Sequence, residues 1–216
     1  ELLRKAVRCE PVDRVPVVPC GNAYFARAQH VLLKDYITDF DKACDANLTE
    51  LKRIGADGTQ NVIFSPYLLG TQWLSKAALP GQELGDDDMW QIKEMGWDAF
   101  QKQFIAEKCD NNWENLKPFF EANPRCYQKF YEAGIPCIVD FLMITPFEYF
   151  CGGRSLEAFF MDDLMEEPEL MHEIFDMVLE HNLKAYKQQI KDTHALGVWI
   201  GGWRTGPDLV SPKMFD

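Results

Sequence analysis

Two carboxylates, Asp140 and Glu148, lie within and just after a short apolar stretch of the chain. A carboxylate inside an apolar run needs a partner or a reacting group, and one in a loop can donate or accept a proton. We therefore predict that these two residues are catalytic. Two structural alternatives stay open: Asp140 as a hydrogen-bonded interior residue, and Glu148 as an acid in the first turn of a helix.

A second set of side chains could bind a substrate. Arg204 follows an apolar stretch and stands beside Trp203 among glycines, where it could bind an anion, stack on a ring, or form a structural salt bridge. Neutral hydrogen-bonding groups occur in or after two earlier apolar stretches. The predicted substrate-binding residues are Asn22, Tyr24, Gln60, Phe147, Trp203 and Arg204.

Metal ligands are not clustered in this sequence. The four histidines, His30, His172, His181 and His194, form no closely spaced pair, and the seven cysteines include no C-x-x-C pair. Zinc sites need clustered ligands, so we predict no metal site in this segment. The odd number of unclustered cysteines favours reduced thiols and a cytoplasmic protein. Cys20 and Cys151, at the ends of strand-derived segments, are the two cysteines expected near a binding site.

These candidate residues need elements that bring them together. Short apolar runs predict strands at 14–20, 57–64, 135–144 and 197–201, whereas 68–94 is mixed and includes an acidic, turn-rich loop. Helical periodicity predicts helices over 38–55, 97–131 and 155–193, with breaks near 109–112, at Pro118 and at Pro168, and a helix start at Ser211. Both sides of the helix over 168–193 are apolar, which suggests contacts on two faces.

Strands that alternate with helices predict a parallel α/β sheet, whose ligands bind at the carboxyl ends of the strands. A doubly wound sheet and a barrel both satisfy this order. The 216 residues suffice for one domain with a sizeable core. The net charge of −12 argues against binding to nucleic acid or an anionic membrane surface, and no apolar run approaches the ~20 residues of a membrane span.

Three phrases resemble the uroporphyrinogen decarboxylase superfamily. "RCEPVDRVPV" (Arg8–Val17) resembles its "GEPVDR-P" opening, and "IPCIVDFLMITPF" (Ile135–Phe147) resembles its "P-L-I-G-F … P-W/F" strand and loop, with one extra residue before Pro146. "WRTGPDLVSPKMF" (Trp203–Phe215) resembles its "W-A-G-x-L-S-P-x-x-F" segment. The matches occur in the family's order and span most of the chain.

The resemblance implies a (β/α)8 TIM barrel with its active site at the carboxyl-terminal mouth. The "SP-x-x-F" phrase falls after the middle of such a barrel. We therefore expect residues 1–216 to form one domain of this type, truncated at the C-terminus and comprising the N-terminal half to two-thirds of the barrel.

The superfamily includes decarboxylases and methyltransferases, and this sequence differs from the decarboxylases at two motifs. The decarboxylase's arginine-bearing "M-R-Q-A-G-R" corresponds here to "VPCGNAYFAR", and the aspartate of its "F-S-D-I-L" corresponds to Pro66. A pocket for an octacarboxylate needs such cations. The chain therefore looks nearer to the corrinoid-dependent methyltransferases, which move a methyl group between a small substrate and a corrinoid protein.

The function predicted first is methyl transfer to or from a corrinoid carried by a partner protein. The alternatives are uroporphyrinogen III decarboxylation, in porphyrin and haem biosynthesis, and a non-catalytic barrel that binds a tetrapyrrole or corrinoid protein. Zinc would have to be bound by residues beyond Asp216. The predicted partners are a small-molecule substrate and a corrinoid protein, and a homodimer is compatible with the sequence.

Overall fold

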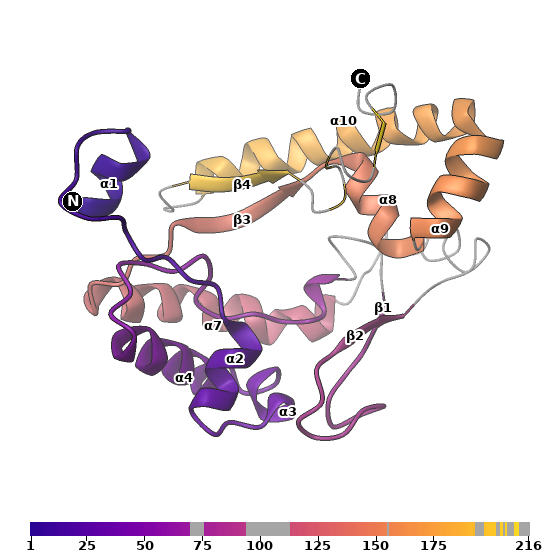
Figure 1. Cartoon of the computed structure of the whole chain (residues 1–216). Coiled ribbons are helices and arrows are strands. Elements are labelled where there is room, and N and C mark those ends of the chain that lie inside the picture. Colours follow the sequence, from indigo (N-terminus) through magenta and orange to yellow (C-terminus); the bar gives the residue numbers. More distant parts are fainter. Residues whose placement is uncertain are drawn as a thin grey trace.

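The computed structural model describes residues 1–69, 76–93, 113–154, 156–192 and 197–201, together with residues 204, 206, 210 and 211. Its elements form a mixed α/β arrangement (Figure 1). The helices are α1 (Leu2–Val7), α2 (Asn22–Ala28), α3 (Leu33–Tyr36), α4 (Phe40–Arg53), α7 (Trp113–Glu132), α8 (Pro146–Arg154), α9 (Leu156–Ala158), the π-helix η1 (Phe159–Leu164) and α10 (Pro168–Asp192). The strands are β1 (Lys76–Ala78), β2 (Gln91–Lys93), β3 (Val139–Ile144) and β4 (Gly197–Gly201).

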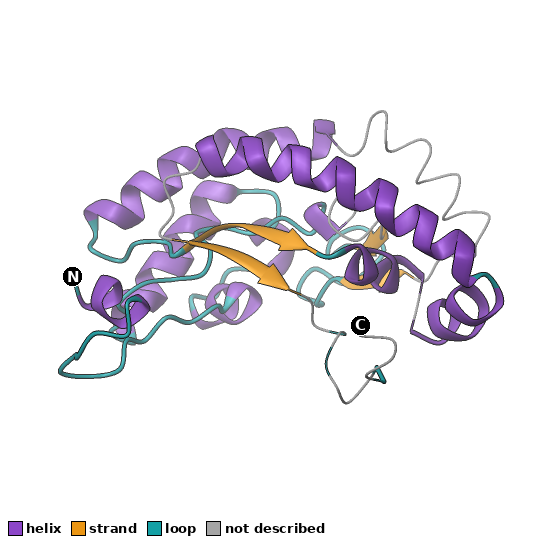
Figure 2. Ribbon diagram, turned by 90° about the horizontal axis from the view of Figure 1, so that it is seen from above, coloured by secondary structure: helices purple, strands orange, loops and turns teal. Residues whose placement is uncertain are grey.

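Two of the four expected strands pair as predicted. β3 and β4 are parallel, and Ile144 lies opposite Gly201 at their carboxyl ends (Figure 2). The register is irregular between Val139 and Leu142, where β3 has one more residue than the facing part of β4, the pattern of a β-bulge. β1 and β2 form a separate antiparallel pair within the stretch that had no clear prediction. Figure 1 shows α10 on one side of β3 and β4, with α7 and α4 on the other.

The predicted strands at 14–20 and 57–64 are wrong, because neither segment forms a regular ladder. Pro16 and Pro19 remove backbone donors from the first segment. In the second, the Thr59 hydroxyl donates to the Pro19 and Asn61 carbonyls, at 3.3 and 2.9 Å, and such side-chain bonds compete with a ladder.

These segments nevertheless lie beside the sheet. The Asp57 amide donates to the Val17 carbonyl at 2.8 Å. A single parallel bridge joins Thr59 to Cys137, and the Ile138 amide donates to the Thr59 carbonyl at 2.9 Å. Backbone contacts therefore connect 14–20 to 57–64, and 57–64 to the chain entering β3. The described residues form two two-stranded sheets and not the closed eight-stranded barrel that the resemblance implies.

The helix predicted after residue 38 is confirmed as α4. The Asp39 carboxylate caps it by accepting the Lys42 amide at 3.0 Å, and Gly55 follows the helix with a φ of 68°. The break predicted at Pro168 is also confirmed, since α10 begins there, at the position where proline suits a helix.

The break predicted at Pro118 is wrong. α7 continues through Pro118 and Pro124. Each proline removes only one backbone hydrogen bond, and the buried side chains of Leu116 and Phe130 hold the helix against the core. The expected helical segment before Trp113 and the helix start after Ser211 lie outside the described residues.

Apolar side chains gather in two cores. The first core joins α2, α3, α4 and α7 to residues 62–69 and the β1–β2 hairpin, and it includes Tyr36, Leu51 and Phe130. The second core joins α8, η1 and α10 through Phe150, Cys151, Phe159, Met171 and Val178. The charged residue Glu148 and the ion-paired Arg154 and Asp163 are buried beside this smaller core. Met177, Leu179 and Leu183 of α10 remain 58%, 44% and 40% exposed.

Candidate functional site

Glu148 occupies the first turn of α8, immediately beyond the carboxyl end of β3. Thr145 caps the helix, since its hydroxyl oxygen accepts the Glu148 amide at 3.4 Å, and Pro146 follows at the first helical position. This T-x-x-E order is that of a capping box, in which the glutamate usually turns back to the cap residue. The Glu148 carboxylate here points instead to the residues that follow β4.

Arg204 is the partner of Glu148. Its backbone N–H donates to Glu148 Oε2 at 2.9 Å, and its Nη1 donates to Oε1 at 3.3 Å. The Glu148 side chain is fully buried, whereas the Arg204 side chain is 29% exposed. The pair therefore joins the first turn of α8, after β3, to the residues that follow β4, with the carboxylate inside and the guanidinium at the border with solvent.

The buried carboxylate has a clear physical consequence for Arg204. A charge buried without a partner is costly, so Glu148 stabilises the position of the arginine, and the arginine compensates the burial of Glu148. Arg204 contacts Glu148 through both its backbone and its side chain, and these two contacts restrict the guanidinium more than a single contact could. The arrangement can hold a cation in a defined place where an anionic or electron-rich atom could meet it.

Cys151 lies one helical turn after Glu148 and is buried. Burial raises the pKa of its thiol to about 12, while the charge of Arg204 opposes this rise and that of Glu148 adds to it. The thiol is consequently neutral at physiological pH and is a poor nucleophile. Cys151 was one of two cysteines expected near the site, and it does interact electrostatically with both charged residues.

A neutral polar group joins the end of segment 14–20 to the middle of segment 57–64. Asn61 Nδ2 donates to Asn22 Oδ1 at 2.8 Å, and the Cys20 thiol donates to Asn61 Oδ1 at 3.4 Å. Cys20 and Asn22 were expected in the site, whereas Asn61 was not. A polar residue directly before the apolar Val62 and Ile63 was the signal for Asn61.

Other predicted binding residues are placed elsewhere. Tyr24 is 58% exposed and interacts with Glu50 and Arg53 of α4. Phe147 packs against the second core, with its ring centroid 5.0 Å from that of Phe159. Gln60 is half-buried, and its carbonyl accepts the Cys137 thiol at 3.2 Å.

The remaining two predicted residues cannot be placed by their side chains. Asp140 belongs to β3 by its backbone and lies in the irregular part of the register. Its side chain, like the whole of Trp203, lies outside the described residues. The structure therefore brings together Glu148 and Arg204 in one place, and Cys20 and Asn22 in another.

The described part of the chain contains no group of three or more histidine, cysteine or acidic residues that could hold a metal ion. In the same part, no helix has the length and apolar character needed to cross a bilayer. No protein-family model, curated protein or solved structure matches this chain.

Proposed function

We propose that the chain is the N-terminal part of a (β/α)8-barrel enzyme of the uroporphyrinogen decarboxylase superfamily, acting in methyl transfer between a small methylated substrate and a corrinoid protein. The proposal places the enzyme in the cytoplasm. The observation that carries it is the buried Glu148–Arg204 pair at the carboxyl ends of the parallel strands β3 and β4. This is the edge at which parallel α/β folds bind their ligands.

The arrangement of the backbone supports the barrel part of the proposal. The segments 14–20, 57–64, β3 and β4 are connected in sequential order by backbone contacts, and the strand pairings between the last three are parallel. Sequential parallel neighbours are the order of a barrel wall. The bulge in β3 also lies close to the extra residue that distinguishes this chain from the family's strand phrase, and a bulge can accommodate an inserted residue.

The sequence predicted both Asp140 and Glu148 as catalytic carboxylates, but the contacts of Glu148 suggest a different role for it. Because Glu148 is buried and bonded to Arg204, we assign it as a positioning residue. Arg204 then becomes the residue that touches the substrate, where it stabilises the electron-rich atom left when the methyl group departs. Asp140 keeps the proposed role of proton donor to that atom, on the ground of its place in β3.

The proposed methyl transfer moves a methyl group away from a heteroatom of the substrate. A corrinoid held by a partner protein would supply the methyl acceptor. When the bond from the methyl carbon to its heteroatom breaks, both electrons would stay on the heteroatom, where Arg204 would stabilise the charge and Asp140 would supply the proton. The net charge of −12 favours a small neutral substrate over an octacarboxylate.

The decisive experiment uses the full-length protein with a purified corrinoid protein and a panel of methyl donors, and follows the cobalt absorption spectrum. We expect methylation in the wild type and at least a tenfold loss of kcat in Arg204→Gln. The exposed Arg125→Gln serves as the matched control, since it also removes an ion-paired arginine, and it should retain full activity.

The role of Glu148 needs a separate comparison. Glu148→Gln keeps the shape of the side chain but removes its charge, so we expect KM and kcat to worsen together while circular dichroism stays unchanged. Arg204→Lys should then recover part of the activity lost in Arg204→Gln. Uroporphyrinogen III decarboxylation by the wild type would overturn the proposal, as would tight corrinoid-protein binding without any methyl transfer.

A further inference from the structure

Two buried thiols face each other between α4 and α7. Cys44 and Cys126 are 2% and 1% exposed, both belong to the first core, and both are free. The Cys126 thiol contacts the Phe40 carbonyl, one helical turn before Cys44, at 3.9 Å. The described part of the chain includes four other cysteines, of which Cys9 and Cys20 are exposed.

Ion pairs on both sides of the thiols show how the two helices are aligned. Arg125 donates to the two carboxylate oxygens of Asp41, each at 2.8 Å, and Lys129 pairs with Asp45. Asp41 and Asp45 come before and after Cys44 on α4, while Arg125 and Lys129 come before and after Cys126 on α7. The alignment places the two cysteines opposite each other, and the packing of the first core holds the two helices together.

The local charges favour a reactive Cys126. The neighbouring Cys44 thiol is the main cause that lowers the pKa of Cys126, and the charges of Arg125 and Lys129 act in the same direction, whereas burial and the Asp41 carboxylate oppose it. The Cys126 thiol in turn raises the pKa of Cys44, with burial as the second cause. Thiolate character is what makes a cysteine attack an oxidant, and positively charged neighbours promote it.

We propose that Cys44 and Cys126 form an oxidant-sensitive thiol pair that closes to a disulfide between α4 and α7 when the protein meets a peroxide. The Cys126 thiolate attacks one peroxide oxygen, the O–O bond breaks, and the sulfur becomes a sulfenic acid while the first water is released after protonation. The Cys44 sulfur then attacks the Cys126 sulfur, and the S–O bond breaks to release the second water. Two thiols thus lose two electrons and two protons, and hydrogen peroxide becomes two molecules of water.

The packing makes this bond feasible inside the fold. The Cys126 thiol already contacts the Phe40 carbonyl, one helical turn before Cys44. Small shifts of the two packed helices can therefore bring the sulfurs to the bond length of about 2.05 Å. The closed loop would contain about 80 residues, so the bond would strongly restrict the unfolded chain. Because both sulfurs are buried, only a small oxidant admitted by local opening should reach them.

The test treats the whole chain with hydrogen peroxide, quenches it, blocks the remaining thiols under denaturing conditions and maps the peptides without reduction. We expect a Cys44–Cys126 cross-link in most molecules, a melting temperature raised by about 5–15 °C, and return of both properties to the starting values after dithiothreitol. Cross-links confined to other cysteines, or oxidation of Cys9 and Cys20 with Cys44 and Cys126 still reduced, would overturn the proposal.

Replacing each cysteine by serine shows which of the two thiols is oxidised first. In Cys44→Ser the sulfenic acid on Cys126 should persist and be trapped by dimedone, whereas in Cys126→Ser neither the trapped adduct nor the cross-link should form at this pair. A Cys9→Ser/Cys20→Ser protein keeps the buried pair and serves as the matched control, and it should cross-link as fully as the wild type. Loss of the Cys44–Cys126 cross-link in this control would show that the exposed thiols are required and would contradict the proposal.

Discussion

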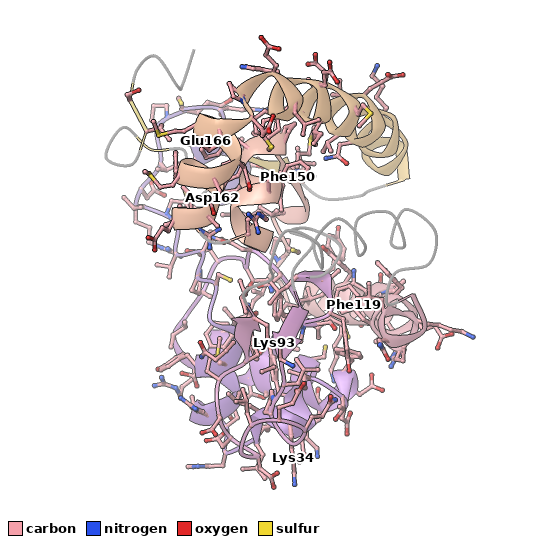
Figure 3. All side chains as sticks on the ribbon, turned by 90° about the vertical axis from the view of Figure 1, so that its right-hand side faces the viewer. Lys34, Lys93, Phe119, Phe150, Asp162 and Glu166 are labelled. Carbon is pink, nitrogen blue, oxygen red and sulfur yellow. The ribbon has the colours of Figure 1, made fainter. Side chains whose placement is uncertain are left out.

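The buried polar groups beside the two cores of this protein differ mainly in how they are paired. In the first core the buried side chains of Asn47 and Thr59 are neutral and bond to backbone carbonyls. The buried carboxylate of Glu50, at the edge of this core, pairs with the exposed guanidinium of Arg53. Beside the second core the described buried polar groups are the charged residues Glu148, Arg154 and Asp163, and the last two form an ion pair in which both partners are buried. Figure 3 shows the two parts of the molecule, with Phe119 in the first and Phe150 in the second.

The difference follows from the amount of apolar surface available. The first core draws on four helices, an extended segment and a hairpin, so neutral groups only need to complete the backbone's hydrogen bonds. The second core has five fully buried apolar members, supported by partly buried aromatic rings. Its charged pairs connect α8 to η1 and to the residues after β4, and their stability depends on each charge keeping its partner.

The largest expected effect comes from breaking the buried ion pair of the second core. Arg154 Nε and Nη2 donate to the two Asp163 carboxylate oxygens at 2.8 and 2.9 Å, and both side chains are nearly inaccessible. Arg154→Ala leaves the Asp163 carboxylate without this partner, and it should lower the free energy of unfolding by about 3–5 kcal/mol. Urea denaturation followed by circular dichroism measures the change.

A double replacement by apolar residues sharpens this prediction. Arg154→Met combined with Asp163→Leu removes both charges, so it should recover most of the stability that Arg154→Ala loses. A double variant as unstable as the single one would mean that the pair acts through its shape and not through its charge.

An intermediate effect is expected from the first core. Asn47 Nδ2 donates to the Val62 carbonyl at 2.8 Å and to the Tyr36 hydroxyl at 3.0 Å. Asn47→Ala should destabilise the protein by about 1–3 kcal/mol, because buried acceptors lose their donor. Unlike the loss from Arg154→Ala, this loss should hardly depend on pH or salt, and thermal denaturation at two ionic strengths can compare them.

Glu50, at the edge of the first core, should make the stability of the fold depend on pH in the acidic range. The Arg53 guanidinium is the main cause that lowers the pKa of Glu50 from 4.5 to about 2, and the Gln29 amide also contributes. A carboxylate with a lowered pKa stabilises the fold above its unfolded value, and this stabilisation disappears as the pH falls from about 4.5 toward 2. The stability difference between wild type and Glu50→Gln should therefore shrink over this range. A constant difference would contradict the assignment.

The smallest effect is expected from an exposed pair on the surface of the first core. Arg125 and Asp41 have side chains that are 53% and 68% exposed, so water screens their attraction. Arg125→Ala should leave the melting temperature nearly unchanged, in contrast to Arg154→Ala. An effect as large as that of Arg154→Ala would remove the distinction between buried and exposed pairs on which the comparison of the two regions rests.

Local patterns in the sequence predicted several elements correctly. The cap at Asp39 and the glycine at 55 delimit α4, Pro168 starts α10, and the apolar runs before Thr145 and Gly202 are the strands β3 and β4. Each of these depends on interactions within a few residues, or on an apolar run that must be buried. The strands predicted at 14–20 and 57–64 failed because prolines and side-chain hydrogen bonds replaced the ladder. The effect of the prolines is local, whereas the hydrogen bond from Thr59 to the Pro19 carbonyl depends on how two distant segments meet.

Patterns in the sequence were enough to predict where α4 and α10 start and that Glu148 and Arg204 follow apolar strands. Only the tertiary structure decided that these two residues bond to each other, that Tyr24 turns toward α4, and that Phe147 packs into a core. It also placed Cys44 against Cys126, which lie 82 positions apart in the chain. The physical reason is that capping and periodicity act over one helical turn, whereas burial and charge pairing depend on which surfaces meet after the chain has folded.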